Sequence, residues 1–186
     1  MSNGLPALVA HPTTPPRNAV AVGAAARLEP RGLVLRFVLG AAPGVLALAP
    51  RAPRPGRRDR LWEHTCCEAF VGTPAGESYL ELNLAPSGDW ALWGFDGYRA
   101  GMHAAATPAP RIRVVHAADG LRVDAILDVS VVHGLLGAPP WTVGLAAVVE
   151  EQDGQRSYFA CRHAGARPDF HAAASRTLAV YPPGDA

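Results

Sequence analysis

The chain has 186 residues, of which 49% are hydrophobic and 18% are charged, and its formal net charge is +1. That length and composition are enough to bury a full hydrophobic core, which excludes an intrinsically disordered chain. A net charge near zero gives no global attraction to nucleic acid or anionic membranes, and the absence of lysine excludes Schiff-base and phosphate-loop lysine chemistry.

The N-terminal segment and the cysteines bear on the cellular compartment. Met1–Pro16 has no basic start followed by an apolar run, so we expect no secretory signal. No apolar run approaches the length that spans a bilayer. Cys66, Cys67 and Cys161 make no disulfide framework and no paired metal site. We therefore expect a cytoplasmic protein without a metal.

Frequent turn residues, with 19 glycines and 18 prolines, divide the chain into short segments that are typical of strands. Between these turns, alternating or continuous apolar residues predict strands. In the first half of the chain they are Ala19–Glu29, Leu33–Leu39, Val45–Ala49, Glu63–Val71, Tyr79–Ala85 and Trp90–Phe95.

The second half continues the same pattern and contains one predicted helix, Val129–Leu136. Turns are expected at Asp119-Gly120 and Asp153-Gly154, because these pairs favour tight hairpins. The strands there are Arg111–His116, Leu121–Leu127, Trp141–Glu150, Arg156–His163 and Arg176–Tyr181. About nine or ten strands among these eleven segments predict one all-β domain over residues 1–186, an antiparallel, jelly-roll-like β-sandwich, with residues 1–18 as an extended N-terminal segment.

The alternation predicts which face of two strands carries polar groups. In Tyr79–Ala85 the leucines point to one face, and Tyr79, Glu81 and Asn83 point to the other. In Glu63–Val71 the same period places His64 and Glu68 together with Phe70. We expect these polar groups to gather on one half-buried face.

Several motifs in combination resemble the bacterial DOMON-like domain proteins, which are relatives of the family 9 carbohydrate-binding modules. The motifs are Leu61-Trp62-x-His64-Thr65-Cys66-x-Glu68-x-Phe70, Tyr79-x-Glu81-x-Asn83, Pro86-Ser87-Gly88-x-Trp90-Ala91, Tyr98-Arg99-x-Gly101-Met102, Ser157-Tyr158, His163 and Pro168-Asp169-Phe170-His171. The resemblance covers most of the chain from about Leu33. It implies a β-sandwich of two antiparallel sheets that binds a sugar or haem. Cys67 departs from the family, which carries an aromatic residue there.

The leading hypothesis is a ligand-binding module for a carbohydrate or a similar polar small molecule. Sugar recognition needs planar hydrogen-bonding groups and an aromatic surface for the ring. The candidate ligand-binding residues are Trp62, His64, Glu68, Glu81, Asn83, Trp90 and Arg99, with Trp93 as a further aromatic. In the structural alternative, Glu68 or Glu81 simply pairs with Arg99 to close the sandwich.

Two other functions stay open. Haem b would need two axial ligands, for which Met102 with His163 or His171 are the candidates. A glycoside-active hydrolase would use two carboxylates among Glu63, Glu68 and Glu81, or His64 as a base oriented by Glu68. Since no nucleophile motif is present, binding is favoured over catalysis. The sequence does not specify the oligomeric state.

Overall fold

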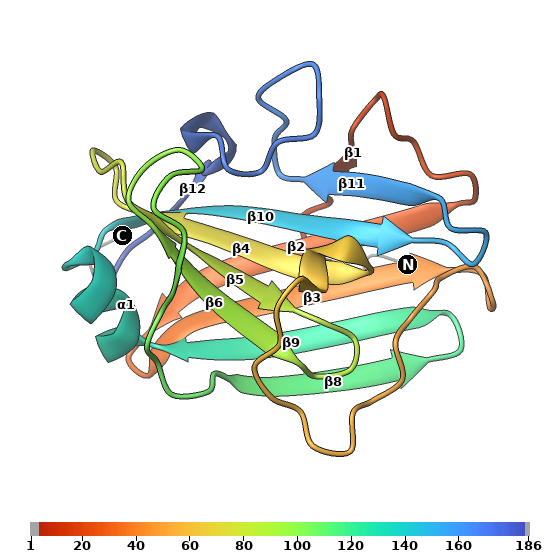
Figure 1. The fold of residues 1–186 in the computed structure, drawn as a ribbon, viewed down its shortest axis with the longest axis horizontal. Coiled ribbons are helices and arrows are strands. Elements are labelled where there is room, and N and C mark those ends of the chain that lie inside the picture. The colour runs from red at the N-terminus through yellow and green to blue at the C-terminus, as the bar shows by residue number, and fades with distance from the viewer. Residues whose placement is uncertain (1–3, 185–186) are drawn as a thin grey trace.

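The structure is a computed structural model that describes residues 4–184, and it consists of two antiparallel β-sheets packed face to face (Figure 1). The larger sheet has the strand order β1-β11-β10-β4-β5-β6-β7, with β12 also paired to β10. Its strands are β1 (Val9–Ala10), β4 (Cys66–Gly72), β5 (Tyr79–Leu84), β6 (Trp90–Phe95), β7 (His103–Ala104), β10 (Trp141–Glu150), β11 (Arg156–Ala160) and β12 (Leu178–Val180).

The smaller sheet has four strands in the order β2-β3-β9-β8. They are β2 (Val20–Glu29), β3 (Gly32–Ala41), β8 (Arg111–Ala117) and β9 (Gly120–Asp128). The predicted β-sandwich is therefore confirmed, with more strands than the sequence pattern predicted. The hairpin between β8 and β9 turns at Ala118-Asp119, within the predicted Ala117–Gly120 turn, and Gly120 is the first residue of β9. Gly120 has φ +153°, and a Cβ there would lie 2.0 Å from the Leu39 carbonyl oxygen on β3, so this position requires glycine.

Several predicted segments differ from the structure. The strand predicted over Arg156–His163 ends at Ala160, and the one predicted over Arg176–Tyr181 spans only Leu178–Val180. Val45–Ala49 forms no strand and contributes only an isolated bridge from Leu46 to Glu151. The strand predicted from Glu63 begins at Cys66, because Leu61–Glu63 forms a 3-10 turn. The N-terminal segment is not merely extended, since β1 pairs with β11. Strands as short as β1 and β7 are too brief to produce a detectable alternation.

The hydrophobic core lies between the two sheets and is built by the alternation along each strand. Leu80, Leu82 and Leu84 of β5 are at most 3% exposed, and they belong to the same cluster as Leu35 and Phe37 of β3. Each such side chain contributes about 1.5–3 kcal/mol by leaving water. This core fixes β4 and β5 in register, and so it also fixes the residues on their outer face.

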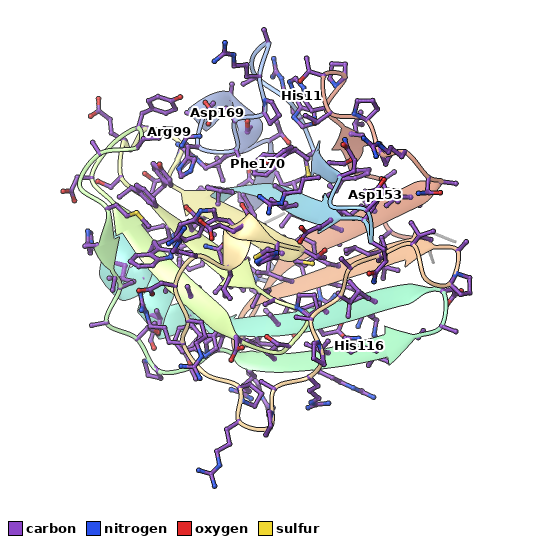
Figure 2. The ribbon with its side chains drawn as sticks, turned by 45° about the vertical axis from the view of Figure 1, so that its right-hand side comes forward. His11, Arg99, His116, Asp153, Asp169 and Phe170 are labelled. Carbon is purple, nitrogen blue, oxygen red and sulfur yellow. The ribbon has the colours of Figure 1, made fainter. Side chains whose placement is uncertain are left out.

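The outer face of the larger sheet is buried as well, under two loops. A second apolar cluster forms there, and its members are Phe70, Tyr79, Phe95, Ala146, Val148, Ala160 and Phe170. The loop between β6 and β7 supplies Arg99, and the segment after β11 supplies Asp169 and Phe170; Figure 2 shows these three residues close together. The polar face predicted on β4 and β5 is therefore a covered, largely aromatic surface.

The predicted helix is present as α1 (Val129–Leu136), and Asp128 caps it by accepting a 2.9 Å hydrogen bond from the Ser130 backbone N–H. Within residues 4–184, no helix has both the length and the apolar character needed to cross a membrane.

Candidate ligand-binding site

A cavity of about 340 Å³ lies between the outer face of the larger sheet and the loops that cover it. Strands β4, β5, β6, β10 and β11 supply its floor and walls, and the two covering loops supply its rim. Its lining residues are Trp62, Glu68, Glu81, Phe95, Arg99, Met102, Val148, Tyr158, Pro168, Phe170 and His171.

Two carboxyl groups and one amide form the floor of this cavity. Glu68 on β4 lies opposite Asn83 on β5, and Glu81 is two residues before Asn83. All three side chains are buried: Glu68 is 3% exposed, Glu81 is 4% exposed and Asn83 is 0% exposed. Asn83 Nδ2 donates a hydrogen bond of 2.7 Å to Glu81 Oε1. Glu68 Oε1 is buried and has no hydrogen-bond partner within residues 4–184. A buried acceptor without a partner costs free energy unless a ligand or water supplies a donor.

Burial raises the pKa of both floor carboxyl groups. For Glu68 the pKa is well above its usual range, first because the side chain leaves water and then because Glu81 carries a like charge. For Glu81 burial raises the pKa, while the Asn83 hydrogen bond and the charge of Arg99 oppose the rise. The floor therefore retains a proton more readily than free carboxylates do, and it can donate as well as accept hydrogen bonds.

His171 is positioned by a chain of hydrogen bonds. The Arg99 backbone N–H donates to the Tyr79 hydroxyl at 3.2 Å, and the same hydroxyl is hydrogen-bonded to His171 Nδ1 at 2.8 Å. The other ring nitrogen, Nε2, lies 3.8 Å from Glu81 Oε2. Burial, followed by the charge of Arg99, lowers the pKa of His171 to about 4. The imidazole is thus neutral at pH 7 and offers one N–H donor and one acceptor nitrogen.

Asp169 joins the two loops at the rim. Its Oδ1 accepts hydrogen bonds from Arg99 Nη2 at 3.0 Å and from the His171 backbone N–H at 3.1 Å, and its Oδ2 accepts from Tyr98 at 2.7 Å. Although burial alone would raise the pKa of Asp169, the hydrogen bonds from Tyr98 and Arg99 lower it. The carboxylate therefore stays charged and holds both loops over the floor.

Aromatic side chains form the walls. Phe95 stacks on Tyr79 with ring centroids 4.7 Å apart and planes at 3°. Phe170 packs against Phe70 at 6.2 Å and against Tyr158 at 6.1 Å. These contacts lock the rings in place, so the cavity presents fixed apolar surfaces above a polar floor.

Trp62 completes the wall from outside the sheet. It precedes β4, in the 3-10 turn, and its ring meets that of Trp93 edge to face at 6.2 Å. The Arg57 guanidinium lies 4.5 Å above the Trp93 ring. Trp62 therefore lines the cavity while its ring packs against Trp93, which Arg57 covers in turn.

The structure brings together Trp62, Glu68, Glu81 and Arg99 of the predicted ligand-binding residues. Asn83 is fully buried and does not line the cavity, but its hydrogen bond to Glu81 helps to orient that carboxyl group. His64 and Trp90 do not lie at the cavity. Because β4 begins only at Cys66, the strand period does not extend to His64, which is exposed and bonds Glu150 Oε2 at 2.7 Å through its Nδ1 atom.

Trp90 is instead a core residue, 8% exposed, in the cluster between the sheets. The alternation along Trp90–Phe95 is the signal that could have shown this, because it places Trp93 and Phe95 on the face opposite the core. Tyr158 and Phe170 belong to the quoted family motifs, but the sequence pattern did not indicate that they would form walls.

The haem alternative fits this donor set poorly. Met102 and His171 line the cavity, but His163 is elsewhere, with Nε2 at 2.8 Å from the Val9 carbonyl oxygen. His171 Nδ1 is hydrogen-bonded to the Tyr79 hydroxyl, and its Nε2 lies 3.8 Å from Glu81 Oε2. No group of three or more His, Cys, Asp or Glu side chains within residues 4–184 is arranged to hold a metal ion. Cys67 packs in the core between the sheets, whereas Cys66 Sγ lies 3.7 Å from Asn83 Oδ1.

Comparison with known proteins gives similarity in structure only. No protein-family model and no curated protein sequence matches the chain. A crystal structure from Bacteroides uniformis ATCC 8492, described as a "putative carbohydrate-binding protein", aligns with a TM-score of 0.69 at 16% identity, over 95% of this chain and 85% of that one.

A family 9 carbohydrate-binding module from Caldicellulosiruptor kristjanssonii also aligns, in two structures that contain glucose and cellotriose. The TM-scores are 0.53 and 0.52 at 10% and 12% identity, over 90% of this chain and 78% and 77% of the others. The chain has the fold of the family 9 carbohydrate-binding modules. At these identities the likeness establishes the architecture alone, and the DOMON-like resemblance stays a prediction.

Proposed function

We propose that the protein is a carbohydrate-binding module that holds a sugar, without covalent chemistry, in the cavity above Glu68 and Glu81. The observation that carries this proposal is the unpartnered, buried Glu68 Oε1 in the floor of an aromatic-walled cavity. A sugar hydroxyl is a donor that would satisfy this oxygen. The fold shared with sugar-binding modules supports the same conclusion.

The chemistry of the cavity suits vicinal hydroxyl groups. Each hydroxyl can donate one hydrogen bond and accept others, so it needs both kinds of partner close together. Glu81 and Glu68 supply acceptors, the retained proton supplies a donor, and His171 Nε2, beside Glu81, supplies a further hydrogen-bonding atom. The rings of Phe95, Phe170 and Trp62 supply apolar surface for the C–H face of the sugar.

Hydrolysis is the less favoured use of the same carboxyl groups. A glycosidase needs one carboxyl group ionised, as nucleophile or base, while the other acts as acid. Here burial raises the pKa of both Glu68 and Glu81, and Glu81 Oε1 already accepts a hydrogen bond from Asn83. The arrangement therefore favours hydrogen bonding to a ligand over nucleophilic attack.

The test is calorimetric titration of the full chain with a panel of mono- and oligosaccharides that includes glucose and cellotriose. We expect at least one saccharide to bind, and Glu81→Gln and Trp62→Ala each to weaken that binding about tenfold or more, the change that 1.4 kcal/mol produces. Glu63→Gln is the matched control, since Glu63 bonds Arg60 and does not line the cavity. Saccharide binding that survives unchanged in both cavity variants would place the site elsewhere.

A further inference from the structure

Arg176 is buried beside the sugar cavity and has no charged partner among the residues that the structure describes. It lies between the 3-10 turn Ala173–Ser175 and β12, and it is only 8% exposed. Its guanidinium carbon is 5.0 Å from the centre of the Tyr79 ring. The guanidinium also lies against Gly72, where a Cβ atom would approach Nε to 3.0 Å. The absence of a side chain at Gly72 thus makes room for the arginine.

The hydrogen bonds of Arg176 are incomplete. Nη1 has one long contact, 3.4 Å to the His171 carbonyl oxygen, and Nε is buried with no partner within residues 4–184. No carboxylate in that range lies within 4.0 Å of the guanidinium. Burial lowers the pKa of Arg176, and the nearby Tyr79 opposes that shift. A buried cation without a counter-charge is costly to the fold, which indicates a role for it.

A second cavity, of about 310 Å³, opens next to this arginine. Its lining residues are Gly76, Glu77, Tyr79, Tyr98, His171, Ala173 and Arg176. Tyr79 and His171, joined by their hydrogen bond, separate it from the sugar cavity, and His171 borders both. Among the described residues that line this second cavity, Arg176 is the one arginine, and the Tyr98 hydroxyl is already bonded to Asp169.

We propose that the cavity at Arg176 is a second binding site, which accepts an oxoanion group such as a carboxylate or a sulfate. A guanidinium is planar and presents its donors in a fork that matches two oxygens of such a group. The exposed Glu77 carboxylate on the same cavity opposes an anion and would weaken the site. The oxoanion has two sources: a free ion, or the acidic group of a saccharide whose ring occupies the neighbouring cavity, and this second source rests on the proposed function.

The experiment titrates the full chain, at constant ionic strength, with sulfate, glucuronate and glucose, and follows binding by calorimetry. We expect sulfate or glucuronate to bind wild type at least tenfold more tightly than they bind Arg176→Gln. Arg167→Gln, on an exposed part of the same segment, is the matched control and should bind as wild type does. Glu77→Gln should bind the anion about two- to fivefold more tightly, because a like charge is removed.

The ligands separate the two sources. Sulfate binding without glucuronate binding assigns a free ion, whereas glucuronate binding that exceeds both sulfate and glucose binding assigns an acidic saccharide. If Arg176→Gln does not fold, the affinity of Glu77→Gln for the anion tests the proposal in its place, and tighter binding than in wild type supports it. Wild type that binds neither anion, or anion binding unchanged by Arg176→Gln and by Glu77→Gln, overturns the proposal. Loss of glucose binding in Glu81→Gln is independent of these outcomes and reports on the sugar cavity alone.

Discussion

Asn83 donates a hydrogen bond of 2.7 Å to Glu81, two residues earlier on the same strand, and both side chains are buried beneath the cavity. Side chains at positions i and i+2 of a strand point to one face, so the backbone places the amide where it can hold the carboxyl group. The orientation of Glu81, and with it the polar geometry of the floor, depends on Asn83.

Removing that amide should destabilise the protein. Asn83→Ala leaves Glu81 Oε1 buried without its donor, and we expect the free energy of unfolding to fall by about 1–3 kcal/mol. Urea denaturation at pH 7 measures this change, with the exposed Glu77→Gln as a control expected within about 0.5 kcal/mol of wild type. If Asn83→Ala unfolded at the same urea concentration as wild type, the amide would contribute nothing to the stability of the protein.

The buried acid Glu68 should make stability depend on pH in a defined direction. Its pKa is higher in the folded than in the unfolded protein, so the unfolded chain releases the proton first and stability falls as pH rises above about 4.5. Glu68→Gln removes this penalty. We expect its Tm to exceed that of wild type at pH 7 by at least about 2 °C, the effect of roughly 1 kcal/mol in a domain of this size.

Thermal melts of both proteins between pH 4 and 8 check this prediction, because the difference in Tm should shrink towards zero at pH 4. His171 changes stability in the opposite direction over part of this range, but it is present in both proteins and its effect cancels in the difference. A Tm difference that is constant with pH would mean that the Glu68 carboxyl group is not shifted by burial.

Two tryptophans that the sequence placed in the same role should behave differently. Trp90 packs between the sheets, so Trp90→Ala should cost about 3–5 kcal/mol of stability. Trp62 lines the cavity and is partly exposed, so Trp62→Ala should weaken saccharide binding about tenfold or more while it lowers stability much less than Trp90→Ala does. Chemical denaturation and calorimetric titration of the two variants, side by side, measure the contrast. If Trp62→Ala and Trp90→Ala lowered stability equally, Trp62 would have a structural role rather than a binding role.

Arg99 combines a functional side chain with an unfavourable backbone conformation. Its φ is +53°, a value that glycine adopts without strain and alanine does not. We expect both Arg99→Ala and Arg99→Gly to lose the contact with Asp169 and to weaken ligand binding. Arg99→Gly should nevertheless be more stable than Arg99→Ala by about 1 kcal/mol. Denaturation curves of the pair give this difference directly, and the reverse order would contradict it.

The sequence was sufficient for the fold because strand alternation and turn residues are local signals. The alternation in Tyr79–Ala85 correctly separated Leu80, Leu82 and Leu84 from Glu81 and Asn83. The alternation in Glu63–Val71 placed Glu68 on the same face as Phe70, as observed.

The covering loops were not predictable in the same way. Asp169 meets Arg99 only because residues 70 positions apart fold over the same sheet, and no periodic pattern encodes that contact. His64 was misplaced because a 3-10 turn interrupts the strand period just before it. Nothing in the sequence indicated that Arg176 has no charged partner among the described residues, because such a lack is visible only once the neighbours of a side chain are known.

Asp169 joins the two covering loops to each other, and the sequence of these loops can vary more freely than that of the sandwich beneath them. The sandwich is held by apolar packing between its sheets, to which the two loops above the cavity contribute little, and one carboxylate fastens those loops to each other. Substitutions in the loops can therefore reshape the entrance and alter which molecules are admitted while the scaffold beneath stays folded. In proteins with this architecture, we expect differences in ligand preference to arise from substitutions in the covering loops, while the acidic floor is retained.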